Sequence, residues 1–139
     1  MTYRLLLDTN ILLDFMDPTR PESDAAVEVF RRCIRGTHEG FICATSLKDL
    51  YYIARKYLGE QAARDFYRAF LAAFTVLGVD DTVCRMALDS NEPDLEDAIV
   101  RVLAEENGID FILTRDAEAF RASTVRSLST AAFLRLFPE

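Results

Sequence analysis

Short apolar segments alternate with amphipathic segments of helical spacing along the whole chain. We expect strands at residues 3–7, 41–44, 75–79, 110–113 and 125–128. We expect helices at residues 11–16, 22–35, 45–58, 61–74, 81–88, 95–107 and 130–136, with a helical turn at 117–120. Strands that alternate with helices predict an α/β domain, with a central parallel sheet of four to five strands and helices on both faces.

Composition and charge limit the class of protein. The chain has 139 residues with neither a repeat nor a linker, so we expect a single domain over residues 1–139. Its 23 acidic and 16 basic residues give a formal net charge of −7. This balance argues against a protein that coats nucleic acid through positive charge, and it is compatible with carboxylates gathered around a divalent metal.

Histidine and cysteine usage excludes several kinds of site. His38 is the single histidine, which rules out histidine-rich zinc sites. The three cysteines, Cys33, Cys43 and Cys84, include no Cys-x-x-Cys motif, so we expect neither a disulfide framework nor structural zinc and assign the chain to the cytoplasm. No apolar run approaches the roughly 20 residues that span a bilayer, so we expect no membrane partner.

Four aspartates lie near the predicted strand ends where ligands of an open parallel sheet bind. Asp8 follows the first strand directly, and Asp116 follows the fourth after two residues. Asp49 lies in the first turn of the helix after the second strand, and Asp97 lies at the start of the helix before the fourth. Right-handed winding brings such positions to one sheet edge, where hard oxygen ligands suit Mg²⁺ or Mn²⁺.

Helix capping is the alternative interpretation of the same acids. Residues 46–49 and 94–97 both fit a capping box, with an acid in place of the usual glutamate. Asp116 fits a cap for the turn at 117–120, and Asp8 fits one for the helix after it. Asp14, which lies between two apolar residues, is interpreted as a solvated acid or one that supports the site from behind.

Four segments resemble, in order, the motifs of the PIN-domain nucleases, especially the bacterial VapC-like toxins. They are LLLDTNILLD at residues 5–14, SLKDLYYI at 46–53, DLEDAI at 94–99 and FILTRD at 111–116. The resemblance covers nearly the whole chain. It implies a PIN-like fold and a nuclease that depends on Mg²⁺ or Mn²⁺ and acts on RNA.

The resemblance also implies roles for particular residues. Asp8, Asp49, Asp97 and Asp116 are the catalytic, metal-binding acids. Asn10, Thr114 and Asp94 support them. Apart from the resemblance, the basic residues Arg20, Lys48 and Arg115 are candidate contacts to RNA phosphates, and the alternative for each is a solvated surface charge. The chain departs from many relatives in having Asp49 in place of glutamate, and Ala119 in place of an acid before Phe120.

Family toxins pair with a protein antitoxin and often form homodimers, so the resemblance implies both partners. The two helices at residues 45–58 and 61–74 carry many aromatic side chains, which fit either a partner surface or the core. We expect a metal-dependent endoribonuclease that is the toxin of a toxin–antitoxin pair. The alternatives are a catalytically silent PIN-like module that binds RNA or a protein, and a nucleotide-binding or phosphatase-like domain. The last lacks a glycine-rich phosphate loop after the first strand.

Overall fold

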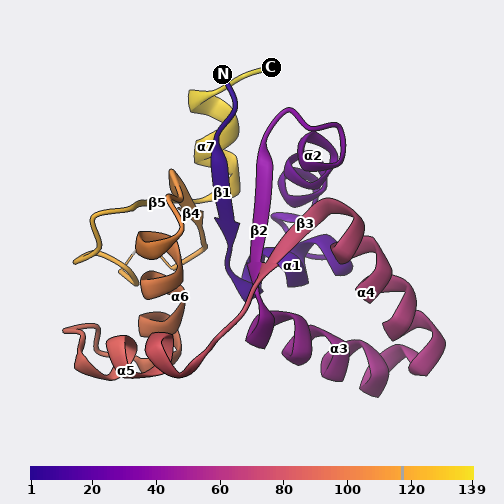
Figure 1. Cartoon of the computed structure of the whole chain (residues 1–139). Coiled ribbons are helices and arrows are strands. Elements are labelled where there is room, and N and C mark those ends of the chain that lie inside the picture. The colour runs from indigo at the N-terminus through magenta and orange to yellow at the C-terminus, as the bar shows by residue number, and fades with distance from the viewer. Residues whose placement is uncertain (117) are drawn as a thin grey trace.

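Five parallel strands form the central sheet of the computed structural model, which describes residues 1–116 and 118–139 (Figure 1). They are β1 (Arg4–Leu7), β2 (Glu39–Cys43), β3 (Phe74–Leu77), β4 (Phe111–Leu113) and β5 (Arg126–Leu128), in the order β3-β2-β1-β4-β5. Every paired neighbour is parallel. The predicted α/β fold with a parallel sheet is therefore confirmed.

Helices cover both faces of this sheet. In the described residues they are α1 (Thr9–Met16), α2 (Ser23–Ile34), α3 (Ala44–Leu58), α4 (Glu60–Ala73), α5 (Asp81–Asp89), α6 (Leu95–Glu106) and α7 (Thr130–Leu136). Figure 1 shows α5 and α6 on one side of the sheet and α1, α2 and α4 on the other, with both termini at the end opposite the start of α3. None of these helices is long and apolar enough to span a bilayer.

The central strand β1 is buried on both faces, as a parallel strand between two helical layers must be. Leu5 and Leu7 pack into the core formed with α1, α2, α4 and α7, and Leu6 packs into the core formed with α6. This alternation follows from the two-residue period of a strand. Because β1 pairs with β2 and β4, its carboxyl end lies in the middle of the sheet edge.

The helix α3 starts earlier than predicted. It begins at Ala44, directly after β2, and no side chain caps its first turn. Ser46 is therefore inside the helix, and its Oγ accepts a hydrogen bond of 2.7 Å from Thr9 Oγ1. The capping box expected at residues 46–49 is wrong, because a contact with α1 replaces the local one.

The predicted helical turn at 117–120 lies partly outside the described residues, since residue 117 is not among them. The backbone of Phe120 has φ of 66°, in the left-handed region, which ends any regular helix there. The buried Phe120 ring still packs into the core formed with α6.

His38 is buried at the end of the sheet opposite the ends of β1 and β4. Its Nδ1 accepts a hydrogen bond of 3.1 Å from the Tyr3 amide, and its ring lies 5.2 Å from that of Phe133, centroid to centroid. Burial lowers the pKa of His38 below its ordinary value of 6.5, and the positive charge of Arg32 acts in the same direction. The imidazole is thus a neutral core group.

A neutral, buried His38 predicts a loss of stability in acid. Its contribution is complete above the ordinary pKa near 6.5 and is lost as the pH falls towards the lower pKa of the folded state. We expect the free energy of unfolding of the wild type to fall more steeply between about pH 7 and about pH 5 than that of His38→Gln. Urea unfolding at each pH measures both slopes, and equal slopes would contradict the assignment.

Candidate functional site

A cleft of about 450 Å³ opens at the carboxyl edge of the sheet. Its walls come from three segments that are far apart in sequence: the start of α1, the start of α3 and the start of α6. They contribute Asp8, Thr9, Asn10, Leu13, Thr45, Ser46, Lys48, Asp49, Glu96, Asp97, Ile99 and Val100. The fold therefore brings three of the four sequence-predicted acids, Asp8, Asp49 and Asp97, to one cavity.

Asp8 lies at the centre of the edge and makes two hydrogen bonds. Its Oδ1 accepts from the Thr9 amide at 2.9 Å, which makes it the N-cap of α1, and its Oδ2 accepts from Thr114 Oγ1 at 2.9 Å. Burial raises the pKa of Asp8, whereas these two hydrogen bonds lower it, and the charge of Asp116 raises it again. Capping thus accounts for one carboxylate oxygen, and the other is oriented across the sheet by Thr114.

Asp116 is linked to Asp8 through the same threonine. The Asp116 amide donates to Thr114 Oγ1 at 3.2 Å, and Asp116 Oδ1 accepts from the amides of Glu118 and Ala119 at 3.0 and 3.2 Å. The capping alternative therefore describes this side chain correctly. Asp116 does not line the cleft itself, but its charge acts on both Asp8 and Asp97.

Asp97 shows most clearly that like charges gather here. Its pKa is raised from 3.8 to about 6, first by burial and then by the carboxylates of Asp94, Asp8, Glu92 and Asp116 in that order. Asp94 is the N-cap of α6, and its Oδ1 accepts from the Asp97 amide at 3.1 Å. The capping interpretation holds for Asp94, and Asp97 stays available to the cleft.

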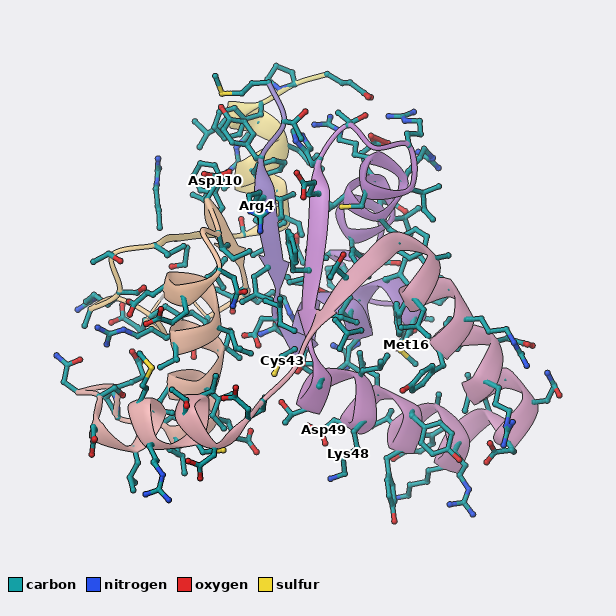
Figure 2. The ribbon with its side chains drawn as sticks, viewed as in Figure 1. Arg4, Met16, Cys43, Lys48, Asp49 and Asp110 are labelled. Atoms are coloured by element: carbon teal, nitrogen blue, oxygen red, sulfur yellow. The ribbon has the colours of Figure 1, made fainter. Side chains whose placement is uncertain are left out.

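Lys48 and Asp49 project from the early turns of α3 at the lower end of the sheet, opposite Arg4 and Asp110 (Figure 2). Both line the cleft and both are exposed. The bond between Thr9 and Ser46 fixes the start of α3 against α1 and so sets where these side chains emerge. Sequence reasoning missed this bond, because the two hydroxyls are 37 residues apart.

Asn10 and Asp14 differ from expectation. Asn10 lines the cleft, but its Oδ1 accepts from the Arg115 amide at 3.3 Å instead of supporting a carboxylate. Asp14 is fully buried and forms ion pairs with Arg20 and Arg115. The expectation of a solvated Asp14 is wrong, because the loops that carry Arg20 and Arg115 pack against this side of α1 and cover the carboxylate. Two of the three predicted RNA contacts are thus held by this acid.

The donor set fits a hard divalent cation. Its candidate ligands are all oxygen, and the pKa values of Asp8 and Asp97 are raised chiefly by burial, with neighbouring carboxylates adding to the rise. Within residues 1–116 and 118–139, no three acidic side chains converge closely enough to hold an ion as they stand.

A buried ion pair that the sequence did not indicate fixes the segment after Asp116. Glu92 and Arg101 lie 3.3 Å apart, with side chains only 4% and 13% exposed. Glu92 Oε1 accepts from the Phe120 amide at 3.4 Å, and Arg101 Nη2 donates to the Ala122 carbonyl at 3.0 Å. The segment is thus anchored to α6, the helix that carries Asp97. In the sequence, Glu92 looks only like part of a break before a proline.

Comparisons with known proteins agree with this fold. A family model described as PIN domain matches residues 4–118. Ribonuclease VapC1 of Aquifex aeolicus is 24% identical over 134 residues, which cover 94% of this chain and 92% of that protein.

Solved structures share the fold. A toxin–antitoxin complex from Klebsiella pneumoniae aligns with a TM-score of 0.68 at 22% identity, covering 91% of this chain and 97% of that one. DNA-bound VapBC from Salmonella typhimurium aligns with a TM-score of 0.68 at 19% identity, covering 94% and 99%. The resemblance drawn from the four sequence motifs is confirmed, and several of these relatives carry VapC or VapBC names.

Removing one partner of the Glu92–Arg101 pair leaves a buried charge uncompensated. We expect Arg101→Met to lower the free energy of unfolding by about 3–5 kcal/mol. The matched control is Arg85→Met, which breaks an exposed ion pair with Asp81 and costs less than about 0.5 kcal/mol. Urea unfolding measures both variants, and a loss for Arg101→Met as small as that of the control would refute the anchoring role.

Proposed function

The chain belongs to the PIN-domain family, and we propose that it is a Mg²⁺- or Mn²⁺-dependent endoribonuclease that hydrolyses RNA phosphodiester bonds. We further propose that it is the toxin of a toxin–antitoxin pair. The observation that carries the proposal is the gathering of carboxylates from four separate segments at one sheet edge, where burial and then neighbouring carboxylates raise the pKa of Asp97 to about 6. The relative named as a ribonuclease supports the reaction class.

In this proposal Asp8, Asp49, Asp97 and Asp116 hold the metal, and each has a distinct position. Asp8 is the fixed member, because Thr114 and the Thr9 amide orient its carboxylate. Asp116 is tied by backbone amides, and Asp97 is placed by the Asp94 cap. A bound divalent ion supplies an activated water and stabilises the charge that develops on the phosphate.

Two further cleft residues, Lys48 and Asn10, have supporting roles in this proposal: one binds substrate and the other holds a backbone segment in place. Lys48 stands beside Asp49 at the cleft and offers a cation to an RNA phosphate. Asn10 holds the backbone of Arg115, and this contact fixes the start of the segment that carries Asp116. A metal among the acids reverses the local sign, so the overall charge of −7 does not oppose a polyanionic substrate.

Protein partners are supported by the α3–α4 hairpin. Phe70 and Phe74 belong to the core, whereas Tyr52 and Tyr57 are 63% and 72% exposed. Some aromatic side chains of α3 and α4 therefore belong to the core, and others are exposed and open to a partner. We propose an antitoxin and a second copy of the chain as partners, which agrees with the toxin–antitoxin complexes among the structural relatives. Cys33, Cys43 and Cys84 are free, which suits the proposed cytoplasmic location.

Cleavage of labelled single-stranded RNA tests the activity. We expect cleavage with Mg²⁺ or Mn²⁺, none with EDTA, and a loss of at least about 100-fold in Asp97→Asn, because the variant removes a charge that stabilises the bound ion. Glu106→Gln removes an acid from the far end of the same helix and should keep wild-type activity.

Cleavage that survives EDTA, or equal rates in wild type and Asp97→Asn, would exclude the carboxylate–metal mechanism. An absence of cleavage of any RNA together with tight RNA or protein binding would favour the silent module instead.

A further inference from the structure

Asp14 is a buried carboxylate that the proposed reaction does not use. Its side chain is 0% exposed, and among residues 1–116 and 118–139 its Oδ2 finds no hydrogen-bond partner. Charges are rarely buried so completely unless they are paired, because loss of hydration is costly. The pairing here is ionic: Asp14 Oδ1 lies 3.5 Å from Arg20 Nη1, and Asp14 Oδ2 lies 3.3 Å from Arg115 Nε.

The two arginines come from loops at the same end of the molecule. Arg20 lies in the loop after α1, and Arg115 lies between Thr114 and Asp116 at the end of β4. Arg115 is held at two points, since its amide binds Asn10 and its guanidinium binds Asp14 one helical turn further along α1. Asn10 also lines the carboxylate cleft, so Arg115 stands at the rim of that cleft.

Both arginine side chains keep part of their surface open to solvent, at 32% and 40% exposed. Arg20 pairs with Asp14 through Nη1 and with the exposed Asp17 through Nε, and Arg115 pairs with Asp14 through Nε. The remaining N–H groups of a guanidinium match the oxygens of a phosphate. With Asp17, which also pairs with Arg20, the two arginines and two aspartates have no net charge, beside a cleft whose titratable lining is acidic apart from Lys48.

We propose that Asp14 is a positioning residue that holds Arg20 and Arg115 as a phosphate-binding pair for the RNA backbone next to the carboxylate cleft. The proposal rests on the proposed function only for the identity of the polyanion. Asp14 lowers the net charge of the surface it organises, so simple charge counting and preorganisation predict opposite effects of its removal.

Binding of a fluorescein-labelled single-stranded RNA, read by anisotropy in EDTA so that no cleavage occurs, distinguishes the two. We expect Arg115→Gln to weaken binding about tenfold and to reduce the slope of log affinity against log salt by about one. We expect Asp14→Asn to weaken binding about threefold or more, although it adds one positive charge.

Asp17→Asn is the matched control. It removes an exposed acid 3.7 Å from the same Arg20, so it changes the local charge equally and leaves the buried anchor in place. Binding by this variant should equal or exceed that of the wild type. Arg115→Lys keeps the charge but loses the planar fork, so it should bind RNA more weakly than the wild type, and it serves as a second test if Asp14→Asn fails to fold.

Three results would overturn the proposal. Asp14→Asn could bind RNA as tightly as Asp17→Asn, Arg115→Lys could keep the wild-type affinity, or the wild type could fail to bind RNA at low salt. Cleavage measured separately with Mg²⁺ keeps the two conclusions apart. If the protein cleaves RNA but the variants do not bind as expected, the nuclease proposal stands and the arginine proposal fails. If the variants bind as expected but no RNA is cleaved, the arginine proposal stands and the nuclease proposal fails.

Discussion

The hydrogen bond from Thr114 to Asp8 joins the ends of the two central strands, and the arrangement of the cleft depends on it. Parallel pairing of β1 with β4 places Leu7 opposite Leu113, so the residues that follow them stand side by side. Thr114 uses one hydroxyl to donate to Asp8 and to accept from the Asp116 amide. One side chain thus couples two candidate metal ligands from segments 106 residues apart.

Much of this arrangement is readable in the sequence. The alternation of apolar strands and helices gives the parallel sheet, and the acids that follow the strands lie at its carboxyl edge because the topology requires it. What the sequence does not reveal depends on pairs that are distant along the chain. The Thr9–Ser46 bond replaces an expected cap, and the Glu92–Arg101 pair anchors the segment beyond Asp116. Asp14 looks solvated only until Arg20 and Arg115 are placed around it.

The carboxylates of the cleft are arranged in a way that favours binding of a cation over stability of the fold. The cleft concentrates carboxylates whose repulsion and burial disfavour the ionised forms of Asp8 and Asp97. Around it, Arg20, Arg101 and Arg115 pair with buried acids and fix the loops. A site whose buried like charges oppose folding is a common consequence of function, and a bound divalent cation would offset that cost.

Thermal melting with and without Mn²⁺ tests this account most directly. The raised pKa of Asp97 means that its carboxylate opposes folding near neutral pH, and asparagine removes that charge at nearly constant size. In EDTA near neutral pH, we expect a higher Tm for Asp97→Asn than for the wild type. Saturating Mn²⁺ should raise the Tm of the wild type and leave that of the variant almost unchanged. A lower Tm for the variant in EDTA, or an equal rise in both chains with Mn²⁺, would contradict a carboxylate metal site at this sheet edge.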